Sequence, residues 1–266
     1  MAKQMCGGAK DMEKITIRFG YGSDIGKERP GNEDSYKVVC REAVPEAIDA
    51  IFVVADGMGG HAAGEVASQM TVESVVETLV SPDNRLGTLG AAEILGLMHS
   101  AIAQANQLIK AEGTRSPEKR GMGTTCTLGV IQDDSLHIAH IGDSRGYLLR
   151  GRNLSRMTED HSVVEEEVRR GLLTTEQARV DPRRNLITAA IGLDRELAVE
   201  TKSVKLFSGD RIMFCTDGLN SMITDQAIET ILAGNEPQES CQSLIDAAND
   251  AGGEDNITVI VADVIR

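Results

Sequence analysis

Short apolar segments recur along the chain, some alternating with polar residues, as at 15–20, and some continuous, as at 50–55. Alternation predicts a strand with one buried face, and a short continuous run bounded by turn residues predicts a buried strand. The expected strands are 15–20, 35–40, 50–55, 124–131, 135–141, 145–150, 199–207, 211–216 and 257–264. Only Ser208-Gly209-Asp210 separates 199–207 from 211–216, so these two strands are expected to pair with each other.

Longer segments carry apolar residues at helical spacing. They predict helices at 64–80, 91–111, 163–170, 225–232 and 237–251. Thr174 and Gln177 form a capping-box pattern that begins a further helix. Strands and helices occur in groups rather than in strict alternation, which predicts an α+β protein with mainly antiparallel sheets.

No internal repeat or linker divides the chain. We therefore expect a flexible N-terminal tail at 1–13, followed by a single domain at 14–266. Within that domain, the segment 153–185 interrupts the strand pattern with charged helical residues.

Composition narrows the possible partners. The chain has 266 residues, of which 41% are hydrophobic, enough for one large core. Acidic residues outnumber basic ones 41 to 27, the net charge is −14, and no basic run occurs. Such a surface repels nucleic acid and anionic lipid, so neither is an expected partner.

The five cysteines show no short-spaced pair, which favours reduced thiols in the cytoplasm. A thiolate phosphatase would carry arginine at the sixth position after its cysteine. Those positions hold Met12, Glu46, Gln132, Ser221 and Ala247. No apolar run approaches the roughly 20 residues of a membrane span, and the start of the chain lacks the apolar core of a signal peptide. We expect a cytoplasmic monomer without membrane contact.

The most informative stretch follows the apolar run 50–55. Asp56 stands at its end, and three of the next four residues are glycine. The glycines let the backbone turn sharply and bring a carbonyl, that of Gly57, beside whatever Asp56 holds. Two oxygen donors from adjacent residues suit a hard cation. The alternative is an ordinary strand-to-helix turn in which Asp56 is a local cap.

Four other aspartates also abut strand-like runs: Asp34, Asp143, Asp217 and Asp255. Asp143 lies between two such runs, and Asp255 is expected to project from the edge formed by the final strand. Acids at strand ends throughout the chain indicate oxygen ligands that converge in space. For Asp143 alone, the alternative is a hairpin-turn residue.

Taken in order, these blocks resemble those of the metal-dependent protein serine/threonine phosphatases, the PPM or type 2C phosphatases. The form Asp56-Gly57-Met58-Gly59-Gly60 is similar to their bacterial branch, and the resemblance extends from about Gly20 to Ile265. It implies a four-layer α-β-β-α sandwich, with two stacked, mainly antiparallel sheets flanked by helices. It makes 153–185 a flap beside the site. It also implies hydrolysis of phosphoserine and phosphothreonine on proteins, opposing a serine/threonine kinase.

The resemblance gives each matched aspartate a metal-binding role. Asp56 is expected to bridge two divalent ions, and Gly57 to lend its carbonyl to one of them. Asp217 and Asp255 would complete the coordination of the inner ion. Asp34 would act mainly through coordinated waters, and the residue matching Asp143 holds a third, weaker ion in relatives.

Three further residues are expected to support the same site. In the resembled family, the arginine five residues before the first metal-binding aspartate contacts the substrate phosphate, and Arg29 stands at that position relative to Asp34. A guanidinium can grip two phosphate oxygens at once, which suits this role. Glu33 is expected to order metal-bound water, and Asn256 to support the ligands from behind. The residues expected to carry catalysis are Asp56, Asp217 and Arg29.

Two metal ions solve the chemical difficulty of phosphate monoester hydrolysis. Held about 3.5 to 4 Å apart, they produce a bridging hydroxide near neutral pH and withdraw charge from the phosphoryl oxygens. Ligands that are all oxygen indicate Mn²⁺ or Mg²⁺ rather than zinc. We expect direct attack without a phosphoenzyme. The alternatives are a metal-dependent phosphoesterase acting on small phosphorylated molecules and a non-catalytic regulatory relative. The latter predicts loss of a ligand aspartate, and every matched one is present.

Three positions depart from the pattern of the resembled family, and one further residue is a candidate metal ligand. Met58 stands where many eukaryotic relatives have His and cannot give up a proton, so the sequence identifies no general acid. Asp181 and Ala189 stand where bacterial relatives often carry His and Arg, which concerns the flap and substrate preference rather than the metal centre. His61, close to Asp56, is a further candidate ligand.

Overall fold

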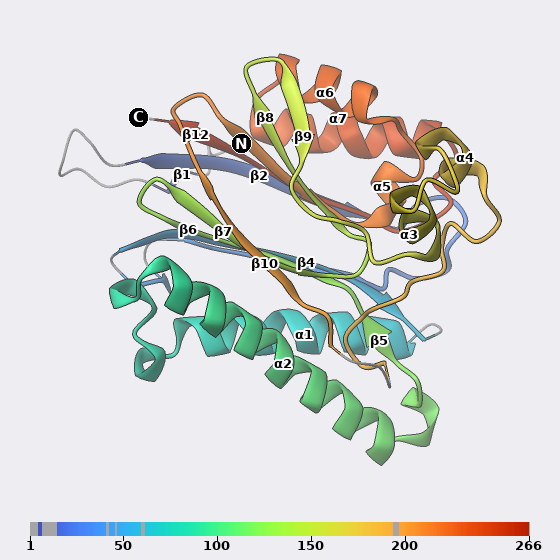
Figure 1. Ribbon diagram of the computed structural model, residues 1–266, viewed down its shortest axis with the longest axis horizontal. Coiled ribbons are helices and arrows are strands. Elements are labelled where there is room, and N and C mark those ends of the chain that lie inside the picture. Colours follow the sequence, from blue (N-terminus) through green and yellow to red (C-terminus); the bar gives the residue numbers. More distant parts are fainter. Residues whose placement is uncertain are drawn as a thin grey trace.

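The computed structural model describes residues 5–6, 15–40, 43–45, 47–59, 62–193 and 197–265. Two β-sheets are stacked face to face (Figure 1). The first sheet has the strand order β1 (Met5–Cys6), β2 (Thr16–Asp24), β12 (Ile257–Ile265), β11 (Arg211–Cys215), β8 (Arg145–Arg150) and β9 (Asn153–Arg156). The second has the order β10 (Glu200–Lys205), β7 (Ser135–Ile141), β6 (Cys126–Gln132), β4 (Ile48–Met58) and β3 (Asp34–Cys40), with β5 (Gly123–Thr124) paired to β4.

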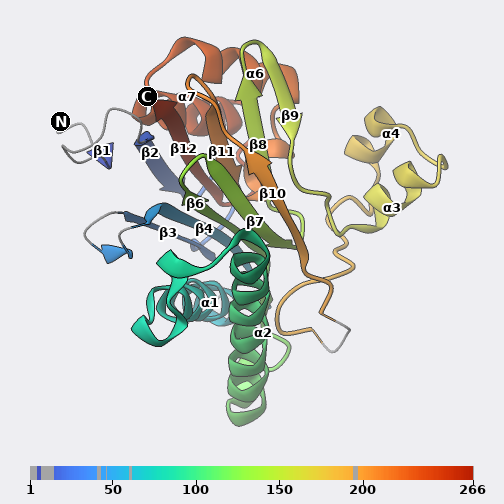
Figure 2. The ribbon, with the colours of Figure 1, turned by 60° about the vertical axis from the view of Figure 1, so that its left-hand side comes forward.

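Helices cover both outer faces of the stacked sheets. The long helices α1 (Ala62–Val80) and α2 (Ala91–Arg115) lie on the second sheet, whereas α6 (Asp225–Gly234) and α7 (Pro237–Asp250) lie on the first (Figure 1). The short helices α3 (Val163–Arg169) and α4 (Thr175–Val180) stand apart from the layers (Figure 2). Every named strand pair is antiparallel. The predicted α-β-β-α sandwich is therefore confirmed.

The apolar run that ends at Asp56 is continuous because both faces of β4 are buried. Ile51, Val53 and Ala55 pack in the core beneath α1 and α2. Phe52 and Val54 point the other way, into the core between the sheets. Alternate strand residues face opposite sides, so a central strand in a four-layer fold must be apolar at every position. This burial fixes β4 as the rigid support of Asp56.

The predicted pairing of the strands near 199–207 and 211–216 is wrong. β10 pairs with β7 at the edge of the second sheet, whereas β11 lies between β8 and β12 in the first. The two strands differ in burial, since β10 is largely exposed and β11 largely buried. The backbone N–H and C=O groups of the buried strand β11 need hydrogen-bond partners on both of its edges. A single hairpin partner would satisfy only one edge, whereas β8 and β12 satisfy both. Likewise, β12 lies inside its sheet between β2 and β11 and is not an edge strand.

Strand β9 lies within the segment expected to lack strands. Its four residues pair with β8 at the edge of the first sheet, and their half-exposed, mostly polar side chains give little hydrophobic signal. The helices expected in this segment are present as α3 and α4. The capping box is confirmed, because the Gln177 N–H donates to Thr174 Oγ1 over 3.2 Å and the Thr174 N–H donates to Gln177 Oε1 over 2.8 Å.

The expected tail at 1–13 lies beyond the described residues, except for β1, which pairs with β2.

Cys126, Cys215 and Cys241 are buried free thiols. Cys40 is disulfide-bonded, so the expectation of five reduced cysteines fails at that residue. None of the helices in the described residues has the length and apolar character needed to cross a membrane.

Candidate metal centre

Asp34 and Asp56 lie side by side where β3 and β4 meet. The register places the two residues directly opposite each other. β4 does not turn at Gly57, as the sequence led us to expect. It continues through Met58, with Gly57 opposite Thr124 of β5, and the left-handed residue is Gly59 at φ 128°. The Asp56 N–H donates to Thr125 Oγ1 over 2.9 Å, which fixes the backbone that carries this carboxylate.

Gly57 is required by close packing rather than by a turn. A Cβ at this position would lie 2.2 Å from the Gly64 carbonyl oxygen and 2.6 Å from the Glu33 carbonyl oxygen. The Gly57 N–H donates to that same Glu33 oxygen over 3.2 Å. Gly64 is less tightly confined, because the atom nearest its added Cβ is Oε2 of the flexible Glu33 side chain at 1.9 Å, and the nearest backbone atom is the Gly57 carbonyl carbon at 2.9 Å. Two glycines thus let β4, the start of α1 and the segment before β3 meet at the site.

Gly57→Ala is expected to destabilise the fold by about 2–3 kcal/mol, because the added methyl meets backbone oxygens that cannot move without shifting α1 or β3. Thermal or urea unfolding measures the loss. Gly234→Ala is the control, since no atom lies within 4 Å of its added Cβ and alanine favours a helix. Equal stabilities of the two variants would contradict the close packing at Gly57.

The other two strand-end aspartates of the expected ligand set, Asp217 and Asp255, come together at the end of the first sheet. Asp217 begins α5 (Asp217–Asn220), directly after β11. Asp255 lies just before β12, which pairs with β11. A Cβ on Gly218 would lie 2.0 Å from the Asn256 carbonyl oxygen, so the two segments are in contact.

Thr216 joins this part of the first sheet to Asp34 in the second. Its hydroxyl donates to Asp34 Oδ2 over 2.8 Å and accepts from the Thr258 N–H over 2.9 Å. Sequence reasoning gave Thr216 no role, although it directly precedes Asp217. The hydroxyl orients Asp34, whose other oxygen, Oδ1, is buried without a hydrogen-bond partner.

Asp143 reaches the site from the connection between β7 and β8. These strands belong to different sheets, so the hairpin-turn alternative is wrong. Its neighbour Ser144 shares a hydrogen bond of 2.7 Å with Thr125, the residue that also holds the backbone of Asp56. The crossover between the sheets therefore places Asp143 near the other carboxylates.

The carboxylates are close enough to shift each other's protonation. Burial is the main cause that raises the pKa of Asp34 to about 7 and that of Asp217 to about 6. Burial also raises the pKa of Asp56 well above its usual range, and the charges of Asp34, Asp217, Asp143 and Asp255 raise it further. The pKa of Asp143 is raised by burial and then by the charge of Asp217. A divalent cation would relieve this mutual repulsion.

The available oxygen atoms fit such a cation. Asp34 Oδ1, Asp143 Oδ1 and Asp217 Oδ1 are buried and have no hydrogen-bond partner. In the described part of the chain, no three Asp, Glu, His or Cys side chains already stand close enough to enclose an ion by themselves. Hard cations commonly complete their shell with waters and backbone carbonyls, so carboxylates spaced around the site suit them.

Arg29, Glu33 and Asn256 lie around the same carboxylates. Arg29 Nη2 donates to Asp255 Oδ2 over 2.6 Å. The buried Asn256 accepts from the Glu33 N–H over 2.7 Å, and its amide nitrogen donates to the carbonyls of Ile25 and Gly31 over 2.9 Å each. Asn256 thereby holds the loop that carries Arg29.

Two of the remaining sequence candidates, Asp181 and Ala189, have no direct place at the carboxylates. His61 lies outside the described residues. Asp181 is held within the flap by Arg183, whose hydrogen bonds are the main cause that lowers the Asp181 pKa to about 2. Ala189 is buried and supplies no charge.

Known proteins with similar sequences and folds identify the family of this chain. The family model described as protein phosphatase 2C matches residues 31–247. The serine/threonine protein phosphatase PstP of Mycobacterium tuberculosis is 37% identical over 94% of this chain, which spans 46% of that relative's length. The serine/threonine phosphatase stp of Listeria welshimeri is 36% identical over 91% of this chain and 94% of its own.

A solved structure extends the likeness to three dimensions. The catalytic domain of PstP in complex with two manganese ions is 36% identical and covers 95% of this chain and 100% of its own, with a TM-score of 0.79. The family match spans most of the chain, and the relatives share its sheets as well as its sequence. This chain therefore belongs to the protein phosphatase 2C family.

Proposed function

We propose that this chain hydrolyses phosphoserine and phosphothreonine in proteins with the help of divalent metal ions. The observation that carries the proposal is the gathering of Asp34, Asp56, Asp217 and Asp255 from both sheets into one mutually repelling cluster, in which Asp255 is partly exposed. Membership of the protein phosphatase 2C family, and relatives whose names state serine/threonine phosphatase activity, support the same reaction.

Two Mn²⁺ or Mg²⁺ ions would be held by these four aspartates and the Gly57 carbonyl, and a third by Asp143. The unpartnered oxygens of Asp34, Asp143 and Asp217 support this assignment. A relative's structure with two manganese ions supports a pair of ions. When bound, such a pair supplies a hydroxide nucleophile near neutral pH and draws charge from the phosphoryl oxygens.

The chain's own residues would orient the metal-binding carboxylates and bind the substrate phosphate. Thr216 and Thr125 fix Asp34 and the backbone of Asp56, so these groups need little reorganisation when the substrate arrives. Arg29 lies beside Asp255 with 48% of its side chain exposed, within reach of both the carboxylates and an incoming phosphate. Its guanidinium can take two phosphate oxygens at once.

Arg29→Ala is expected to raise KM for a phosphothreonine peptide about tenfold, with a smaller change in kcat, because it removes a phosphate contact made before and during the reaction. Steady-state kinetics at saturating Mn²⁺ measures both constants. Arg152→Ala, an exposed arginine on the β8–β9 turn, is the control and should change neither. A fall in kcat with unchanged KM would show that Arg29 does not anchor the phosphate.

The substrate class is tested by comparing a phosphothreonine peptide, a phosphotyrosine peptide and a nucleotide as substrates in the presence of Mn²⁺. The proposal predicts efficient cleavage of the phosphothreonine peptide alone. Preference for the nucleotide would favour the alternative, a phosphoesterase acting on small molecules. No cleavage of any of them would favour a non-catalytic relative. In the proposed setting, the substrates are phosphoproteins produced by a serine/threonine kinase.

A further inference from the structure

A cleft of about 450 Å³ lies between the flap helices α3 and α4 on one side and residues of β8, β9 and α5 on the other. Its inner end is formed by Asp143 and Asp217 of the candidate metal centre, and its walls include four arginines: Arg145, Arg156, Arg179 and Arg184. The volume lies in the range of ligand-binding clefts. Six acidic residues line the same cleft, so only an arginine that lacks a carboxylate partner could offer positive charge to a ligand.

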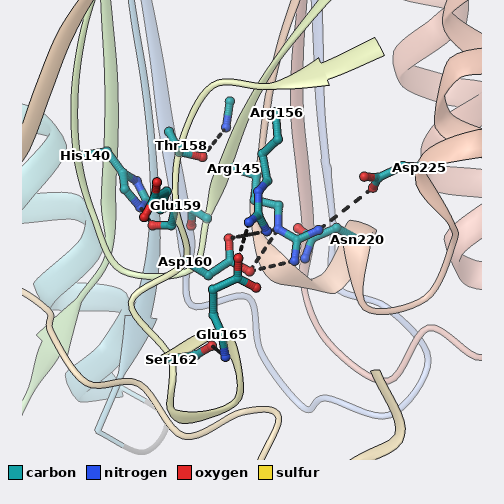
Figure 3. Close-up of polar contacts among 12 residues, drawn as sticks. His140, Arg145, Arg156, Thr158, Glu159, Asp160, Ser162, Glu165, Asn220 and Asp225 are labelled. Carbon is teal, nitrogen blue, oxygen red and sulfur yellow. Dashed lines mark hydrogen bonds and ion pairs between the residues drawn. The ribbon is translucent and has the colours of Figure 1, made fainter. Parts of the chain in front are cut away.

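Three of these arginines are already paired with carboxylates. Arg145 contacts both oxygens of Asp160, with distances of 2.6 to 3.0 Å. Arg156 lies between Asp160 and Glu165, which connects β9 to the flap helix α3 (Figure 3). Arg184 pairs with Glu254 over 3.0 Å. Their charges are therefore neutralised within the protein.

Arg179 differs from the other three. Its guanidinium donates to the backbone carbonyls of Asn220 over 3.2 Å and of Ser221 over 3.4 Å. No described residue offers it a carboxylate. An arginine has five N–H donors, and two long bonds to neutral oxygens leave most of this capacity unused. A half-buried cation of this kind favours an anionic ligand.

The position of Arg179 relates it to the reaction site. Asn220 is the last residue of α5, and Asp217 is the first. Three residues of helix rise about 4.5 Å, so the guanidinium lies on the order of 10 Å from the phosphate position near Asp217. An extended peptide covers about 3.5 Å per residue. A side chain one to three residues from the phosphorylated residue can therefore reach Arg179.

We propose that the flap cleft is a substrate subsite in which Arg179 binds an anionic side chain close to the phosphoserine or phosphothreonine. This inference rests on the proposed function and narrows its substrates to acidic or multiply phosphorylated segments. Aspartate, glutamate and a second phosphorylated residue share the required negative charge. The subsite acts on specificity, because Arg179 does not touch the reacting phosphate.

The test uses phosphothreonine peptides with a neutral background in which one position from −3 to +3 carries Glu, Gln or Lys. A further peptide carries a non-hydrolysable phosphonate analogue of phosphoserine at the preferred position. The enzymes are the full chain, Arg179→Gln and Arg179→Glu. Arg183→Gln is the matched control, since Arg183 is a flap arginine paired with Asp181 and Glu167 and is not among the residues lining the cleft.

For the unaltered chain, Glu at one or two positions should raise kcat/KM about fivefold over Gln, mainly through KM. Arg179→Gln should abolish this preference, Arg179→Glu should reverse it in favour of Lys, and Arg183→Gln should keep it. A larger gain from the phosphonate than from Glu would identify a second phosphate as the preferred ligand.

Equal cleavage of the Glu and Gln peptides by the unaltered chain would overturn the subsite, as would a preference that survives Arg179→Gln or disappears equally in Arg183→Gln. The neutral peptide separates this result from the reaction itself. If it is cleaved normally while no preference appears, the phosphatase function stands and only the subsite is wrong. If no peptide is cleaved at all, the proposed function fails.

Discussion

Asp56→Asn is expected to lower kcat about 1,000-fold and to weaken the binding of Mn²⁺. The substitution keeps the size of the side chain but removes the charge at the centre of the cluster, which the expected bridging role requires. Asp217→Asn should behave similarly. Because the metal-free protein gains from losing a repelled, buried charge, neither variant should unfold at a lower temperature than the unaltered chain without metal.

The measurement combines phosphopeptide kinetics, calorimetric titration with Mn²⁺ and thermal unfolding in EDTA. Asp246→Asn is the control, because Asp246 is an exposed residue of α7 whose carboxylate accepts a hydrogen bond from the neighbouring Gln242 and lies outside the aspartate cluster. It should leave all three quantities unchanged. Full Mn²⁺ affinity in Asp56→Asn would mean that Asp56 is not a metal ligand.

Chelation of divalent ions is expected to abolish hydrolysis, and restoring Mn²⁺ is expected to stabilise the fold. Each ion should contribute about 3 kcal/mol when present at 100 times its dissociation constant. The stabilisation should be larger at pH 8 than at pH 6, because ligation requires carboxylates that have lost their protons. Activity assays in EDTA and thermal unfolding with and without Mn²⁺ measure these effects.

The sign of the pH effect in the metal-free protein follows from Asp34. Its folded-state pKa, about 7, lies above the value near 4 in the unfolded chain, so the folded form holds a proton that the unfolded form has lost. Stability from this residue is therefore present at low pH and is lost as the pH rises through 7. Burial lowers the pKa of His140 to about 4, which acts in the opposite direction below pH 6.5.

Both the unaltered chain and Asp34→Asn contain His140, so the difference between their unfolding free energies cancels the contribution of this histidine to the pH dependence. From pH 6 to pH 8, the metal-free unaltered chain should lose about 1 kcal/mol relative to this variant, a shift of about 2–4 °C in unfolding temperature. A constant difference across this range would show that Asp34 is ionised throughout and is not in a repelling cluster.

The sequence predicted well where a single element carries the signal. The continuous apolar run of β4 marked a buried central strand, and Thr174 with Gln177 marked the start of α4. It also singled out the aspartates beside strand-like runs as one ligand set, which stays a prediction, and Asp56 lies within β4 rather than at its end. It misjudged Gly57, whose role depends on Gly64 and Glu33, residues that only the fold brings against it.

The tertiary structure alone decided the contacts between distant segments. Thr216 and Asp34 are 182 positions apart, and the hydrogen bond between them crosses from one sheet to the other. Where other segments lie also decides which sheet β10 joins, and it leaves Arg179 without a carboxylate partner among the described residues. Local periodicity reports which faces of an element are buried, whereas the identity of its neighbours is set by packing across the whole chain.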